Sequence, residues 1–88
     1  MLVRVRLFAV ARERAGRSIL ETELPDGATV HDLKAAIGRD VPSLAPLLGS
    51  IRFSVNAEYA SDVTPIPPNA ELAAIPPVSG GTDFRVYS

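Results

Sequence analysis

The chain has 88 residues, 47% hydrophobic and 22% charged, a balance typical of one folded domain rather than a disordered tail. Nine basic residues against ten acidic ones leave a formal net charge of −1, which argues against broad electrostatic binding of nucleic acid. There is no cysteine, so disulfides, thiolate metal sites and thiol nucleophiles are excluded.

The N-terminal region predicts neither a secretory signal nor a membrane span. Arg4 and Arg6 interrupt the apolar pattern, and the longest apolar run is far too short to cross a bilayer. We therefore expect a cytoplasmic protein that does not associate with membranes.

Residues 2–24 predict a strand, a short helix and a second strand. Residues 2–8 alternate with a period of two, so one face carries Val3, Val5 and Leu7 and the other carries Arg4, Arg6 and Phe8. Residues 9–15 predict a helix that ends at Gly16 in a left-handed cap. Residues 19–24 alternate again, and we expect Glu21 and Glu23 to lie opposite Arg4 and Arg6.

The main helix is predicted after a turn at residues 25–27. Thr29 is its N-cap, and Asp32 three residues later completes an acidic relative of the capping box. Val30, Leu33 and Ile37 form its apolar face, and Gly38 is expected to end it. The prolines that follow permit only a short helical turn within residues 41–49, which covers the core with Leu44, Leu47 and Leu48.

The second half of the chain predicts two more strands. Residues 51–56 form one, residues 56–59 a turn, residues 61–68 an irregular, proline-broken connection, and residues 71–75 the last strand. This order predicts an α+β fold, a ubiquitin-like β-grasp with a mixed sheet of four to five strands and one main helix packed across one face. A right-handed crossover would bring the last strand beside the first, near the sheet centre.

A stiff arm with a bare tip follows the last strand. Two prolines fix an extended segment, and two glycines then remove the side chains from the tip. From Pro76 to Gly81 the extended reach is roughly 20 Å, enough to enter a neighbouring protein's pocket. We therefore expect the following residues to thread such a channel: Pro76, Pro77, Val78, Ser79 and Gly80.

The outer face of the predicted sheet carries an apolar pair beside the root of this arm. Phe8 and Ile75 both point outward, and they become neighbours if the first and last strands pair. Three arginines, Arg4, Arg6 and Arg52, surround this pair. Such a patch is typical of a docking site for a protein partner.

Several short segments resemble a known family when they are taken in chain order. They are residues 7–9, 11–13 and 16, then 24–25, 27, 29–30 and 33, then 55–56, and finally 76–81. The chain resembles the MoaD/ThiS family of sulfur carriers, most closely the branch formed by the small subunits of molybdopterin synthase. The PPVSGG arm after a β-grasp order is the specific part of the resemblance.

The resemblance implies a non-catalytic carrier whose C-terminal glycine is the reacting group. In this family a ubiquitin-activating-type adenylyltransferase uses ATP to adenylate that glycine's carboxylate, and sulfur replaces AMP to give a thiocarboxylate. By position, Gly81 would carry the thiocarboxylate. The sulfur acceptor implied is cyclic pyranopterin monophosphate, held by the large subunit of molybdopterin synthase, so that no cofactor is bound and catalytic residues belong to the partner.

The chain departs from the family by continuing past the second glycine. Residues 1–81 form the predicted carrier domain and residues 82–88 an extension, so Gly81 is tied into an amide with Thr82. Three interpretations follow: a processing peptidase removes the extension, the extension is permanent, or it derives from an expression vector. We favour removal, and we expect the alternating Phe84 and Val86 to hold the extension against a sheet edge or a neighbouring molecule.

Other functions remain open from the sequence. A protein modifier would join Gly81 to a lysine of a target, and the same sulfur chemistry would serve thiazole, cysteine or tRNA thiolation. A non-catalytic binding module would keep its extension. The only histidine, His31, has no companion at ligand spacing, and we expect no metal site.

Overall fold

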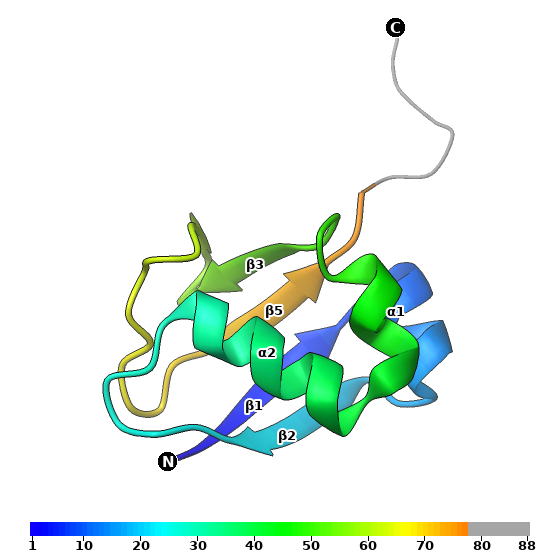
Figure 1. Cartoon of the computed structure of the whole chain (residues 1–88). Coiled ribbons are helices and arrows are strands. Elements are labelled where there is room, and N and C mark those ends of the chain that lie inside the picture. Colours follow the sequence, from blue (N-terminus) through cyan, green and yellow to red (C-terminus); the bar gives the residue numbers. More distant parts are fainter. Residues whose placement is uncertain (78–88) are drawn as a thin grey trace, which may run out of the picture.

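The structure is a computed structural model that describes residues 1–77 (Figure 1). Predictions that concern residues 78–88 lie outside this described part. The elements follow in the order β1 (Leu2–Leu7), α1 (Ala9–Ala15), β2 (Ile19–Glu23), α2 (Val30–Asp40), the 3₁₀ helix η1 (Pro42–Leu47), β3 (Arg52–Val55), β4 (Glu58–Ala60) and β5 (Leu72–Ile75).

One five-stranded mixed sheet organises the fold, with the strand order β2-β1-β5-β3-β4. The first strand pairs antiparallel with β2 and parallel with β5, and β5 pairs antiparallel with β3. The last strand therefore lies at the centre beside the first. The predicted α+β β-grasp architecture is confirmed.

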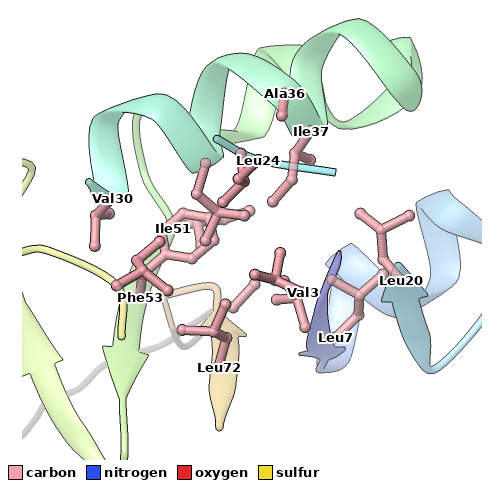
Figure 2. Close-up of a cluster of buried hydrophobic side chains, with 14 of the residues drawn as sticks. Val3, Leu7, Leu20, Leu24, Val30, Ala36, Ile37, Ile51, Phe53 and Leu72 are labelled. Carbon is pink, nitrogen blue, oxygen red and sulfur yellow. The ribbon is translucent and has the colours of Figure 1, made fainter. Parts of the chain in front are cut away.

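The helix α2 packs across one face of the sheet, and the core lies between them (Figure 2). Its contribution is the predicted apolar stripe, with Val30, Leu33 and Ile37 all buried. The sheet contributes the buried half of its alternating pattern, including Val5 and Phe53. We call this side the inner face and the opposite side, on which Arg4 and Arg6 are exposed, the outer face.

The start of α2 is satisfied by its own cap and by a distant loop. The Thr29 hydroxyl accepts a hydrogen bond from the Asp32 N–H, and the Asp32 carboxylate accepts one from the Thr29 N–H, which confirms the predicted capping box. The next two unpaired donors, the N–H groups of Val30 and His31, reach backbone carbonyls of Thr64 and Asp62 at 3.0 and 2.9 Å. The irregular segment 61–68 therefore completes the helix N-terminus.

The predicted helix end at Gly38 is wrong, because α2 continues to Asp40. A Cβ at Gly38 would stand 3.2 Å from the Leu48 Cδ1 atom, which is closer than most such contacts. The glycine thus serves the close approach of η1 to α2, and the helix ends only where the chain turns into Pro42. Leu44 of η1 is buried and Leu47 and Leu48 pack against the core, as expected.

The predicted turn at residues 56–59 is shorter than expected. Asn56 and Ala57 both have positive φ, at 52° and 71°, which is the conformation of a type I′ hairpin. This tight turn allows a fifth strand, β4, to begin at Glu58. Asn56 also binds the start of β5, since its side-chain oxygen accepts from the Glu71 N–H at 2.9 Å.

The arm leaves the sheet from its central strand. After Ile75, Pro76 is buried and Pro77 is exposed. Because β5 has hydrogen-bonded neighbours on both sides, the root of the arm is held by a well-supported strand at the centre of the sheet. The described residues include no helix long and apolar enough to cross a membrane.

Candidate functional site

The candidate site begins where β1 and β5 end side by side. The two strands run parallel, and Leu7 lies opposite Ala74 at the last pair of their register. Phe8 follows Leu7, and Ile75 follows Ala74. The parallel register therefore brings Phe8 and Ile75 to the same end of the sheet, where the arm begins.

Phe8 is held outward by the local backbone. It is the N-cap of α1 in an extended conformation, and Ala9 after it has φ 51°. The abrupt change of direction puts α1 over the end of the sheet and leaves the Phe8 side chain 41% exposed. An aromatic ring held in water at a structured corner is a candidate anchor for a partner.

The three predicted arginines lie on the outer face, with different neighbours. Arg4 forms an ion pair with Glu21 at 3.0 Å, as expected. The expectation that Arg6 also lies opposite a glutamate is wrong, because the register places Ile19 opposite Arg6 and Leu2 opposite Glu23. The connection through α1 sets this register. Just before β2 begins, the Leu7 N–H donates a hydrogen bond to the Ser18 carbonyl.

Arg52 lies on the far side of the arm root from Phe8. It pairs across the ladder with Ile75, and its guanidinium stands 5.1 Å from the centroid of the Tyr59 ring. The guanidinium is thus packed over an aromatic ring at the β4 edge. Of the predicted docking residues, Phe8, Arg4 and Arg6 surround a common hollow, and Ile75 and Arg52 lie beside it.

This outer-face hollow has a volume of about 560 Å³ and a simple origin in the sheet register. One row of paired residues crosses the outer face through Ile19, Arg6, Ala73, Ser54 and Tyr59. Ala73 and Ser54 in this row are small, whereas the residues on either side of them are large. A depression therefore forms over the strands at the middle of the sheet.

Two apolar residues of the hollow were not predicted from the sequence. Leu2 and Ile19 are 56% and 44% exposed, and both line the hollow. The alternation of β2 already placed Ile19 on the same side as Glu21 and Glu23, so its parity was the available signal. With Phe8 they make the outer face more apolar than its arginines and glutamates suggested.

The remaining charged clusters support the fold. Lys34 donates to Asp62 at 2.6 Å, and this hydrogen bond together with the Lys34 charge holds the pKa of Asp62 below its usual range. Within residues 1–77 no group of three or more His, Asp or Glu side chains is placed to hold a metal ion. Gly81 and the threading residues after Pro77 lie outside the described residues.

Comparison with known proteins decides the family. The chain matches the ThiS family over residues 5–81, which is most of its length and includes the glycine pair. The chain belongs to the ThiS family. The predicted membership of the MoaD/ThiS group is therefore confirmed.

Two curated relatives carry the same name. A molybdopterin synthase sulfur carrier subunit of Chlamydomonas reinhardtii is 39% identical and covers 92% of this chain and 100% of its own length. Another protein of that name, from Arabidopsis thaliana, is 35% identical over 90% of this chain and 82% of its own. Both matches favour the molybdopterin synthase branch of the family.

Among solved structures, SAMP1 of Haloferax volcanii has the same fold. It superposes with a TM-score of 0.82 at 29% identity, covering 92% of this chain and 100% of that chain. In a second structure, the H. volcanii protein is named small archaeal modifier protein 1. The ThiS fold is thus shared by proteins named as sulfur carriers and as modifiers.

Proposed function

We propose that this ThiS-family chain is a sulfur carrier, the small subunit of a molybdopterin synthase, and that Gly81 bears its thiocarboxylate. One observation carries the proposal: the central strand β5 ends in a proline pair at the root of an arm whose sequence reaches Gly80-Gly81. A rigidly held root with a side-chain-free tip suits delivery of a small group into a narrow channel. The named relatives support the same function.

The chemistry requires a free carboxylate at Gly81. A carboxylate oxygen attacks the α-phosphorus of ATP, pyrophosphate leaves, and the acyl adenylate then has AMP as a leaving group. A sulfur nucleophile at the level of sulfide adds to the carbonyl carbon and expels AMP, so a C–S bond replaces a C–O bond. The activating enzyme supplies the ATP site, and the sulfur acceptor we propose is cyclic pyranopterin monophosphate in the large subunit.

The extension therefore has to be removed before the carrier can work. In the 88-residue chain the Gly81 carbonyl is part of an amide with Thr82, so Gly81 has no carboxylate to be adenylated. We propose that a peptidase hydrolyses this bond and leaves residues 1–81 with a terminal carboxylate. The glycines on its N-terminal side give the peptidase an unhindered backbone to bind.

The intact mass of the protein from its native host tests this proposal. We expect a species that ends at Gly81, together with one about 16 Da heavier in which sulfur replaces one carboxylate oxygen. A native protein that consists only of the 88-residue form would refute the maturation step. A form ending at Gly81 that never gains the extra mass in the presence of its activating enzyme would refute sulfur carriage.

A second candidate is a protein modifier, and the likeness to SAMP1 favours it. Here the activated Gly81 carbonyl would be attacked by a target's lysine amine, and AMP would leave as an isopeptide bond forms. Denaturing gels of native extracts distinguish the two functions. A modifier gives a ladder of larger adducts that resists reducing agents, and a sulfur carrier gives none.

A further inference from the structure

The strand β2 forms an open edge of the sheet in the described part of the chain. In the order β2-β1-β5-β3-β4, it has β1 on one side and no strand on the other (Figure 1). With five residues it is longer than β4, which forms the opposite edge with three. It contains no proline and no lysine, two common protections of an edge strand against further pairing. Of the two edges, β2 is therefore the one better suited to add a strand.

The register shows which backbone groups of β2 face this open edge. In an antiparallel ladder, successive residues direct their N–H and C=O groups alternately toward and away from the neighbouring strand. The Leu7 N–H donates to the Ser18 carbonyl at 2.8 Å, so Ser18 belongs to the set that faces β1. By alternation, Ile19, Glu21 and Glu23 direct their backbone groups away from β1. No hydrogen bond from another element of residues 1–77 reaches these groups, so each residue offers one N–H and one C=O to a further strand.

The side chains along this edge are complementary to a second copy of themselves. By the parity of the strand, Arg17, Ile19 and Glu21 follow one another on the outer face. Ile19 is 44% exposed, and Arg17 is exposed and forms no ion pair within residues 1–77. The Glu21 side chain remains 50% exposed although Arg4 contacts it. A base and an acid thus lie at equal distances on either side of an apolar residue, and the same order read backwards places acid opposite base.

We propose that β2 pairs antiparallel with β2 of a second copy of the chain, about a two-fold axis at Ile19. Ile19 then lies opposite Ile19 of the second copy, and Arg17 lies opposite Glu21 on both sides of the axis. These are the apolar and opposite-charge pairs that stabilise a ladder. The axis is perpendicular to the sheet, so both outer faces lie on the same side, and the two five-stranded sheets become one continuous sheet.

Other registers of the same two strands are less favourable. An axis at Glu21 would place the two glutamates directly opposite each other, and like charges at such positions destabilise a ladder. An axis at Leu20 would place each Ile19 opposite a glutamate. Shifting either copy by one residue would set outer-face side chains against inner-face ones. The register centred on Ile19 avoids all three conflicts.

The arms remain free in this dimer. The strand β1 lies between β2 and β5, so the strand that carries the arm is two strand spacings, about 10 Å, from β2. Because the axis is perpendicular to the sheet, the two arms leave it in opposite directions. Pairing through one strand per copy buries less than the ~1,600 Å² of a standard interface, so the dimer is expected to be weak.

Disulfide trapping in the full 88-residue chain tests the register directly. Because the chain has no cysteine, Ile19→Cys introduces one thiol per copy. Directly opposed residues of an antiparallel pair have Cα atoms about 5.5 Å apart, within the range of a disulfide. We therefore expect Ile19→Cys, with oxidised glutathione as the oxidant, to give a covalent dimer on non-reducing gels.

The matched control is Glu23→Cys, on the same strand and the same face. In the proposed dimer the two copies of residue 23 lie roughly 26 Å apart along the strands, which a disulfide cannot bridge. Its covalent dimer should form at least about 10-fold more slowly than that of Ile19→Cys, because only chance collisions join its thiols. Equal rates for the two variants, or no dimer from Ile19→Cys, would overturn the proposed pairing.

Sedimentation equilibrium tests the association without a covalent bond. We expect the parent chain to be monomeric at about 10 µM and to show a growing dimer fraction toward about 1 mM, the range of a small interface. A parent chain that remains monomeric at this upper concentration would overturn the proposal. Glu58→Arg, a charge reversal on the opposite edge strand β4, should dimerise as the parent chain does.

Two charge-reversed variants complete the test. Arg17→Glu alone sets acid opposite acid, and Glu21→Arg alone sets base opposite base, so neither variant should associate with itself. An equimolar mixture pairs acid with base at both positions and should form the dimer again. Self-association of either variant alone, or a mixture that stays monomeric, would overturn the proposal. None of these measurements uses an activating enzyme or a sulfur acceptor, so their outcome is independent of whether Gly81 carries sulfur.

Discussion

At the scale of single residues, Phe8 is an exposed aromatic side chain that the fold does not need for its core. It is 41% exposed at the corner between β1 and α1, so replacing it with a charged residue removes little packing from the core. If Phe8 anchors the large synthase subunit, Phe8→Asp should weaken that binding by at least about 30-fold, the effect of losing an interface hot spot.

The control for this prediction is another exposed apolar residue. Val63 is 80% exposed in the irregular segment, away from the arm root, and Val63→Asp should bind normally. Calorimetric titration of both variants, with thermal melts to show that each is folded, checks the expectation. Undiminished binding by Phe8→Asp would remove Phe8 from the docking surface.

Asp62 is the residue that should make stability depend on pH. Its pKa in the folded chain is lowered by Lys34, so the ion pair stabilises the fold above the unfolded carboxyl pKa of about 4 and this contribution disappears as the pH falls through the lower folded value. Asp62→Asn should therefore lower the urea midpoint at neutral pH, and this deficit should shrink as the pH falls below about 4.

Glu13→Gln is the matched control, because Glu13 is exposed on α1 and forms no ion pair within residues 1–77. It should leave the urea midpoint unchanged at neutral pH. An Asp62→Asn deficit of the same size at both pH values would mean that the carboxylate charge is not its cause.

At the scale of elements, α2 depends on contributions from both of its ends. Thr29 caps its start, and near its other end Asp40 accepts a hydrogen bond from the Thr22 hydroxyl of β2 at 2.6 Å. Thr29→Ala should reduce the free energy of unfolding by about 1 kcal/mol, because it removes the hydroxyl that accepts from the helix. Thr29→Ser retains that hydroxyl and should remain near the parent value; equal losses in both variants, measured by urea unfolding, would contradict the capping role.

The elements also show where sequence reasoning succeeds. Local chemistry predicted the bounds of α1, the Gly16 cap with φ 74°, and the capping box of α2, since each depends on residues within a few positions. It misplaced the end of α2, because the space that Gly38 leaves is used by η1 from another part of the chain. The shortness of the hairpin turn was not predicted, because it requires positive φ at both Asn56 and Ala57, and alanine rarely adopts that conformation.

At the scale of the whole molecule, the sheet order followed from the order of elements and the handedness of crossovers. The outer-face hollow could not be predicted in this way. It depends on the register of all four strand pairings, which together place Ala73 and Ser54 between larger side chains. The cross-strand neighbour of Arg6, which is Ile19, was not predicted for the same reason. Register is a property of the assembled sheet, and shifting one strand by two residues changes which charge meets which.

The central position of β5 also determines how the molecule responds to a pull. A tip withdrawn from a deep channel transmits tension along the strand to which it is joined. Because β1 and β3 bond to β5 on both sides, such tension must shear two ladders at once rather than open one of them bond by bond. We therefore expect the fold to resist a pull on the arm, as the proposed delivery of the tip to a partner would require.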